Sequence, residues 1–235
     1  MSRKILFITT SHTQMGQSGR QTGIWAEEVI VPYMLFSEAG YQIDMASPLG
    51  GQAPFDPGSI KPAGQNNPTI ERFLADATAQ AKVKQTLRVS EVNAQPYDAV
   101  FFPGGHGAMW DLPESADVKR VVEQAAAANK VIGAVCHGVA GLVSARLPDG
   151  RSIVAGRRVN AFTDQEEQAA GLTQIVPFLL ESRLTELGGH FEKAPNWASF
   201  AVTDGLLTTG QNPASSALVA QQMLQTLQAT QAVAA

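Results

Sequence analysis

The sequence predicts an α/β domain built on a mainly parallel β-sheet with helices on both faces. Residues 4–10, 98–103 and 130–135 are short runs rich in apolar and β-branched residues, which is typical of parallel strands buried on both faces. Segments with helical spacing of apolar residues, such as 24–39 and 117–129, alternate with these runs. Such an alternation favours parallel strand pairing with helices that cover the sheet.

Length and composition favour one sizeable domain over residues 1–235. The chain is 44% hydrophobic and 16% charged, so it is too apolar to stay disordered. Its net charge of −4 creates no general attraction for phosphate backbones, so we expect no nucleic-acid partner. The apolar run Ile5–Ile8 is shorter than the core of a signal peptide, and no stretch reaches the roughly 18 apolar residues of a membrane span. We therefore expect a cytoplasmic protein without a membrane partner.

The N-terminal part is predicted to hold two strands and a long insertion. Residues 4–10 form the first strand, and the helix over 24–39 ends at Gly40. Residues 41–47 alternate as a second strand, whereas 48–68 are rich in proline and glycine and are irregular. Because residues 69–87 return to a helical composition, the segment 48–95 is predicted to be a cap-like insertion after the second strand.

The C-terminal part continues the same alternation. Residues 98–103 and 130–135 are the third and fourth strands, and 137–145 are small and apolar residues suited to a closely packed helix. Later strands are expected at 158–162, 189–192, 200–202 and 206–208, and later helices at 174–187 and 214–230.

The strongest chemical signal is Cys136, the only cysteine in the chain. A strand leads into Cys136 without a spacer, and His137 and Gly138 follow it, which is the pattern of a nucleophile elbow with cysteine in place of serine. At the start of a helix the thiolate would be stabilised, and the backbone N–H of His137 could hold an oxyanion. The alternative is a buried cysteine that acts as a small hydrophobic residue. A single cysteine excludes an intramolecular disulfide.

A glycine-rich turn, Gly104–Gly107, follows the third strand with the sequence GGHG. Glycines there let backbone N–H groups approach a substrate, so Gly105 could complete an oxyanion hole; an ordinary turn is the alternative. GGHG is not a phosphate-binding fingerprint, so nucleotide binding has little support. The histidines His12, His106, His137 and His190 lack the spacing of metal ligands, and we expect no metal.

Two groups of carboxylates follow predicted strands. Glu28 lies in the first predicted helix, near the sheet edge of Cys136, where its carboxyl could exchange a proton with the thiol; an exposed glutamate is the alternative. The segment FTDQEE, residues 162–167, places acids where one could orient His137 as the third member of a triad, although a solvated helix turn remains equally open.

His190 and Glu192 raise a different prospect. A late His-x-Glu pair occurs in the triad of glutamine amidotransferases, but two residues of a short strand that point to one face explain the pair as well. We favour the strand interpretation because His137 already supplies a base next to Cys136.

Five motifs together resemble the ThiJ/PfpI superfamily over nearly the whole chain. They are TGIWAEE from Thr22, FFPGGHG from Phe101, AVCHG from Ala134, FTDQEE from Phe162 and TGQNPASS from Thr209. The resemblance implies a flavodoxin-like three-layer sandwich, related to class I glutamine amidotransferases. The insertion after the second strand resembles the branch of heat-inducible chaperones and glutathione-independent glyoxalases, also called glyoxalase III or D-lactate dehydratase.

The resemblance also implies roles for individual residues. Cys136 matches the nucleophile, His137 the adjacent histidine and Glu28 the acid near the sulfur, and Gly105 with His137 matches the oxyanion donors. Glu167 best matches the triad acid, and Glu166 is the alternative if the register differs by one residue.

The activity implied is a cofactor-independent lyase that converts methylglyoxal and related dicarbonyls to 2-hydroxy acids through the Cys136 thiol. A protein deglycase, a stress chaperone with an apolar docking surface, and a cysteine peptidase or amidohydrolase remain alternatives. The resemblance further implies a homodimer.

Overall fold

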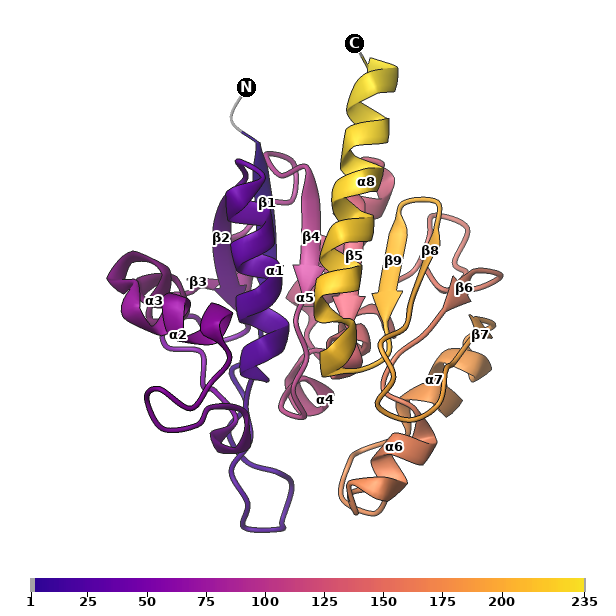
Figure 1. Ribbon diagram of the computed structural model, residues 1–235. Helices are drawn as coiled ribbons and strands as arrows, with labels where there is room; N and C mark the ends of the chain where they lie inside the picture. The colour runs from indigo at the N-terminus through magenta and orange to yellow at the C-terminus, as the bar shows by residue number, and fades with distance from the viewer. Residues whose placement is uncertain (1–2, 235) are drawn as a thin grey trace.

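The computed structural model describes residues 3–234 and contains a seven-stranded sheet with the order β3-β2-β1-β4-β5-β9-β8 (Figure 1). Neighbouring strands are parallel except β8, which runs antiparallel to β9. The strands are β1 (Lys4–Ile8), β2 (Gln42–Ser47), β3 (Leu87–Arg88), β4 (Ala99–Phe102), β5 (Val131–Val135), β8 (Ala201–Asp204) and β9 (Leu207–Gly210). The predicted mainly parallel sheet is confirmed.

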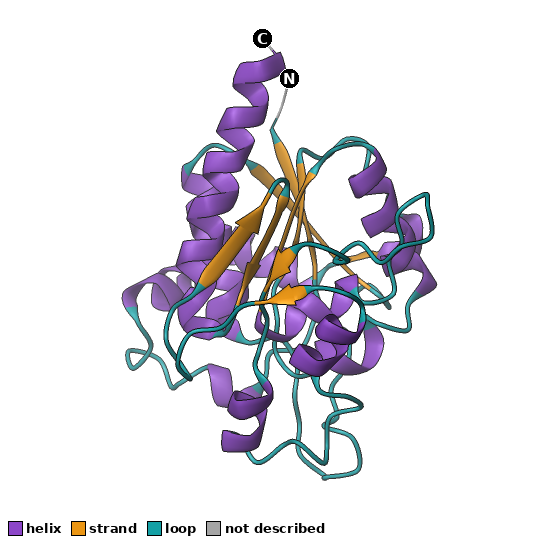
Figure 2. Cartoon of the chain, turned by 90° about the vertical axis from the view of Figure 1, so that its right-hand side faces the viewer, coloured by secondary structure: helices purple, strands orange, loops and turns teal. Residues whose placement is uncertain are grey.

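Helices cover both faces of this sheet, which completes the three layers (Figure 2). One face packs against α1 (Ala26–Glu38) and α8 (Ser216–Ala234), together with α2 (Pro68–Ala75) and α3 (Ala77–Lys84). The other face packs against α5 (Ala116–Ala127) and the short α4 (Ala108–Asp111). None of the described helices is both long and apolar enough to cross a membrane.

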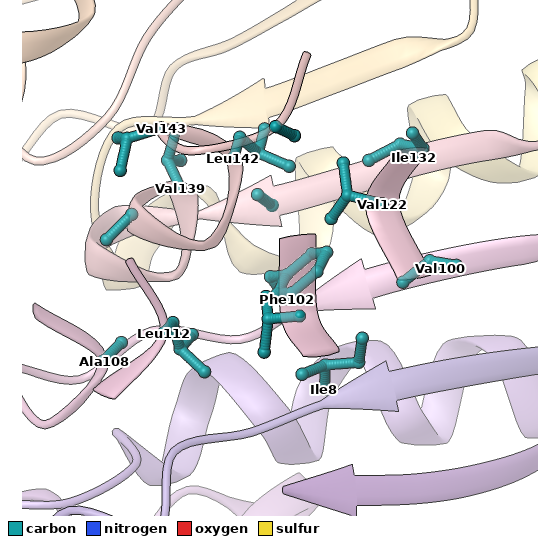
Figure 3. Close-up of a cluster of buried hydrophobic side chains, with 14 of the residues drawn as sticks. Ile8, Val100, Phe102, Ala108, Leu112, Val122, Ile132, Val139, Leu142 and Val143 are labelled. Atoms are coloured by element: carbon teal, nitrogen blue, oxygen red, sulfur yellow. The ribbon is translucent and has the colours of Figure 1, made fainter. Parts of the chain in front are cut away.

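Each face of the sheet carries one buried hydrophobic cluster, and successive residues of a central strand belong alternately to the two clusters. Leu6 and Ile8 belong to one buried cluster, and Ile5 and Phe7 belong to the other. Side chains of a strand point alternately to the two faces, so a sheet covered on both sides needs apolar residues at every position. Figure 3 shows the first cluster, where Ile8, Val100, Phe102 and Ile132 meet helix residues.

The topology places loops of functional interest at one edge. The chain runs outward from β1 to β2 and β3, then crosses to β4 on the other side of β1, so the strand order reverses between β1 and β4. Ligands of open α/β sheets bind at such a switch point, beyond the carboxyl ends of the strands. The segments after β4 and β5 leave the sheet at this edge, which is the lower edge in Figure 1.

The part of the insertion with helical composition, residues 69–87, holds two helices, α2 and α3, and ends in β3. The two helices are separated at Asp76, which has an extended backbone. Its carboxylate accepts hydrogen bonds from the N–H groups of Thr78 and Ala79 and so caps α3. The short turns η1 (Pro57–Ser59) and η2 (Val89–Glu91) and the edge strand β3 complete this part.

Three later predictions need correction. The helix over 174–187 is only α7 (Leu180–Glu186), because Pro177 disfavours helical backbone in the residue before it. The segment after Cys136 is a 3₁₀ helix, η3 (Cys136–Leu142), instead of an α-helix. The strands β6 (Arg158–Val159) and β7 (His190–Phe191) form a separate two-stranded sheet. The remaining elements are α6 (Asp164–Ala169) and η4 (Pro213–Ser215).

Candidate active site

Cys136 lies in a sharp turn directly after β5. Its φ angle is 55°, a left-handed conformation that is costly for any residue except glycine and is concentrated at functional sites. The turn is tight, since a Cβ atom on Gly138 would lie 2.2 Å from the carbonyl oxygen of Phe102. The predicted strand-to-helix elbow is therefore present, with 3₁₀ geometry after it.

His137 connects the thiol to a carboxylate. Its Nδ1 lies 3.3 Å from Cys136 Sγ, and its Nε2 lies 2.7 Å from Glu167 Oε2. Burial raises the pKa of Glu167, but its interactions with His137 and His106, hydrogen bonds included, hold it well below its usual value. An ionised carboxylate can only accept hydrogen bonds, so Nε2 carries the proton and Nδ1 is left to accept one from the thiol. Burial, reinforced by His106, lowers the pKa of His137 and keeps the ring neutral.

Glu166, the alternative triad acid, serves a different purpose. Its Oε1 accepts hydrogen bonds from the Trp197 backbone and from the side-chain amides of Gln211 and Asn212. Its Oε2 accepts hydrogen bonds from the backbone N–H and the hydroxyl of Thr163. Thr163 is the N-cap residue of α6, so the two residues form a capping box. The structure therefore brings Glu167 to His137 and commits Glu166 to anchoring α6 and the loop of Trp197.

Glu28 is fully buried in the first turn of α1, so the exposed-glutamate interpretation is wrong. Its Oε2 accepts a hydrogen bond of 2.8 Å from the N–H of Gly104, and its Oε1 has no hydrogen-bond partner among the described residues. Burial raises the pKa of this carboxyl to about 8, although interactions with Cys136 and Gly104 lower it. The group is thus mostly protonated at neutral pH, with a pKa near the working range of a proton carrier.

The expected thiolate at Cys136 is not what the structure supports. Burial raises the pKa of the thiol well above its usual value, and the neighbouring Glu28 raises it further. Only the backbone N–H of His137 works in the opposite direction. A macrodipole argument also has little force, because the following helix is a short 3₁₀ segment. In the resting site the sulfur therefore keeps its proton.

The two residues predicted to donate to an oxyanion line the same pocket as this sulfur. Gly105 has φ 106°, and a Cβ atom there would lie 2.2 Å from the carbonyl oxygen of Gly23, so only glycine fits. No residue in the described range accepts a hydrogen bond from the Gly105 N–H. Both Gly105 and His137 line the same pocket as Cys136, so a ligand in that pocket meets both residues.

His106, the histidine of GGHG, has a place in the site that the sequence did not predict. Its Nε2 lies 2.8 Å from Glu167 Oε1, so one carboxylate holds two histidines. The His106 and His137 rings lie 4.0 Å apart between centroids. Residues 106, 137 and 167 are too far apart in sequence for local spacing to reveal this group, and its only signal was a histidine within the glycine-rich turn.

These three side chains also bear on the expectation of no metal. Ligand atoms of His106, His137 and Glu167 lie within 4.8 Å of one another, close enough to share an ion. In the structure both Nε2 atoms instead hydrogen-bond to the carboxylate.

A pocket of about 280 Å³ opens above Cys136. Its wall is largely aromatic and apolar, as in many small-molecule sites. Besides Cys136, Glu28, Gly105, His106 and His137, the lining includes Met15, Arg20, Trp25, Asp56, Gly58, Phe162, Leu172 and Trp197. The insertion contributes Asp56 and Gly58, so it forms part of the wall.

The alternative pair of residues 190 and 192 lies elsewhere. His190 is exposed on β7, and Glu192 forms a salt bridge with Arg158 on β6. Neither residue lines the Cys136 pocket, so they do not form an amidotransferase triad with it.

Comparison with known proteins places the chain in a family. A model of the DJ-1/PfpI family matches residues 21–226. The glutathione-independent glyoxalase hsp3101 of Schizosaccharomyces pombe is 31% identical over 228 residues, 93% of each protein. Glyoxalase 3 of Candida albicans is 29% identical, over 94% of this chain and 97% of its own length.

Solved structures agree with these relatives. The crystal structure of glyoxalase III from Candida albicans matches with a TM-score of 0.88 and 28% identity, over 95% of this chain and 97% of that one. The Rapid Encystment Protein of 24 kDa from Francisella tularensis matches with a TM-score of 0.91 and 38% identity, over 96% and 99% of the two chains. Both the expected flavodoxin-like fold and the resemblance drawn from the motifs are confirmed, and the chain belongs to the DJ-1/PfpI family.

Proposed function

We propose that this protein is an enzyme of the glyoxalase III type, which converts methylglyoxal and related small dicarbonyls to 2-hydroxy acids without glutathione. The observation that carries the proposal is the hydrogen-bonded chain from Cys136 through His137 to Glu167, beside the protonated carboxyl of Glu28. Relatives that match nine-tenths of the chain are named glutathione-independent glyoxalases, which supports this activity.

The first step is addition of the thiol to the aldehyde. His137 Nδ1 accepts the thiol proton, the sulfur bonds to the aldehyde carbon, and the carbonyl electron pair moves to oxygen. The N–H groups of Gly105 and His137 hold this oxyanion. Glu28 then gives its proton to the oxygen, which leaves a hemithioacetal and an ionised Glu28.

The second step moves hydrogen between the two carbons. Ionised Glu28 removes the proton from the former aldehyde carbon, and the electron pair forms an enediolate with the neighbouring carbonyl. Glu28 returns that proton to the neighbouring carbon, while the hydroxyl proton passes from the first oxygen to the second. The product is a thioester of the 2-hydroxy acid on Cys136, with the thiol proton still on His137. Water then releases the acid.

The pocket supports a small substrate. The pocket has a volume of about 280 Å³, and the buried residues Cys136, His137 and Glu28 line it. Such a pocket suits a compact dicarbonyl better than an extended peptide, which needs an open cleft. The scheme uses only protein groups and water.

The test is formation of lactate from methylglyoxal by the purified protein without glutathione. We expect turnover by the wild type and none by Cys136→Ala, with His190→Gln as a control outside the pocket. Equal rates for the wild type and Cys136→Ala would refute the proposal.

A further inference from the structure

We propose that His106 is a further catalytic residue, the base that activates water to hydrolyse the thioester on Cys136. This inference rests on the proposed function and assigns its last step. It starts from the finding that one carboxylate, Glu167, orients two histidines that line the same pocket.

The hydrogen bond of His106 fixes which nitrogen is basic. Nε2 lies 2.8 Å from Oε1 of the ionised Glu167, so neutral His106 keeps its proton on Nε2. Nδ1 then bears the lone pair, and it makes no hydrogen bond with any residue in the described part of the chain. The ring therefore presents a base with the same carboxylate support as His137.

Packing holds the His106 ring at the pocket wall. The ring lies against His137, 4.0 Å away between centroids, and meets the edge of Phe162 at 5.8 Å. Its side chain is 12% exposed, whereas that of His137 is 1% exposed. Of the two histidines, His106 is thus the more accessible to water entering the pocket.

His137 is poorly suited to the hydrolytic step. Its Nδ1 faces the sulfur at 3.3 Å, and after thioester formation it carries the thiol proton. A protonated ring cannot accept a proton from water, but it can give its proton to the departing sulfur. Another group must accept the proton of water. Glu28 is ionised at this stage but is fully buried, whereas the His106 side chain is 12% exposed and so is the base that entering water can reach.

The step balances with these two rings. The oxygen of water bonds to the thioester carbon, and one O–H bond breaks as its proton passes to His106 Nδ1. The C–S bond then breaks with its electron pair on sulfur, and His137 transfers its proton to that sulfur. The products are the 2-hydroxy acid, the Cys136 thiol and neutral His137, with a proton on His106 and Glu28 still ionised. His106 releases its proton to solvent and Glu28 takes one up, which restores the resting site.

The experiment separates thioester formation from hydrolysis. Wild type, His106→Gln and the control His190→Gln are mixed with methylglyoxal and quenched in acid over a time course. The adduct is counted by intact mass, and its thioester fraction by the hydroxamate released with hydroxylamine, because the hemithioacetal has the same mass as the thioester. We expect the wild type and His190→Gln to turn over without accumulating adduct. His106→Gln should acylate Cys136 at close to the wild-type rate and then hydrolyse the thioester about 100-fold more slowly, which is the typical contribution of a general base.

A second variant, His106→Asn, guards against a packing defect, and both variants are checked for wild-type thermal unfolding. Accumulation of thioester in both supports the proposal. Steady-state turnover at the wild-type rate, or equal loss of acylation and hydrolysis, would overturn it and leave His106 as at most a positioning residue. Absence of acid formation by the wild type would instead reject the proposed function itself.

Discussion

Glu166 and Glu167 are neighbours in the chain and both are buried, yet only Glu167 contacts the ring of His137. Glu166 turns its carboxylate to five donors on Thr163, Trp197, Gln211 and Asn212. Two adjacent acids on one short helix thus have different roles: Glu167 acts on His137, and Glu166 holds neighbouring segments together.

Replacement of Glu167 by alanine should impair turnover while Cys136 remains in place. Without the acceptor at Nε2, His137 loses its fixed tautomer and the stabilisation of its protonated form. We expect kcat/KM for methylglyoxal to fall by roughly two to four orders of magnitude, less than in Cys136→Ala. Wild-type kinetics in Glu167→Ala would contradict the triad.

Replacement of Glu166 by alanine should act through stability. The substitution leaves several buried donors without an acceptor, which lowers the free energy of unfolding by on the order of 3 kcal/mol. Urea denaturation should report this loss, and the folded fraction should retain more activity than Glu167→Ala. If Glu166→Ala is fully stable but inactive, the roles of the two acids are reversed.

The sequence predicted the sheet, the elbow and the family, because buried strands and a Cys-His-Gly turn leave strong local patterns. It left Glu166 and Glu167 unresolved, since their difference depends on where Asn212 and Trp197 fold. The shared hydrogen bonds of His106 were equally invisible, because they join segments that only the topology brings together.

The error about the Cys136 thiolate has a physical origin. The sequence reveals a helix start after the cysteine but not the depth of burial or the nearby carboxyl, and both raise the thiol pKa. The burial of Glu28 could not be predicted for the same reason, because the helical spacing of its neighbours does not show how deeply the side chain lies.

Glu28→Gln should make the Cys136 thiol more acidic although it slows turnover. The negative charge of Glu28 raises the pKa of the thiol, so a neutral amide should shift the pH profile of iodoacetamide labelling to lower pH. The measurement is alkylation rate against pH by intact mass, with unfolded protein as reference. A wild-type profile centred below that of the unfolded thiol would restore the thiolate interpretation.

Glu28 should also shape the pH dependence of stability. Burial raises its pKa from the ordinary 4.5 of a glutamate to about 8 in the folded protein, so the folded state binds more protons than the unfolded state between these two pH values. The contribution of the Glu28 carboxyl to the free energy of unfolding is fully present below pH 4.5. It falls as the pH rises through 8, by up to about 1.4 kcal/mol per pH unit. Urea midpoints from pH 5 to 8 should therefore fall less steeply for Glu28→Gln than for the wild type. Parallel curves would contradict the raised pKa.

The homodimer implied by family resemblance remains a prediction. Size-exclusion chromatography with light scattering should give about twice the chain mass of 24.9 kDa. A monomer at working concentration would remove the claim.

The insertion after β2 is predicted to act as a cap, and Asp56 provides the means to test it. Its Oδ2 accepts a hydrogen bond of 3.0 Å from Thr22 Oγ1, and its backbone N–H donates to the carbonyl of Ile24. These contacts tie the insertion to the segment before α1, beside Gly58 in the pocket wall. We expect Asp56→Ala to lower kcat/KM by about tenfold, because a charge-assisted hydrogen bond contributes about 1.5 kcal/mol or more.

The mass in solution decides between the two roles open to the insertion. If it caps the pocket, Asp56→Ala should lose turnover at unchanged mass, and Thr22→Val should show the same loss because it removes the other partner of the bond. Asp149→Ala is the matched control, since that aspartate forms an exposed ion pair with Arg151. A change of mass in Asp56→Ala would assign the insertion to a subunit interface. If both mass and turnover are unchanged, the insertion is a surface loop without either role, because the pocket would then function without the Asp56–Thr22 hydrogen bond.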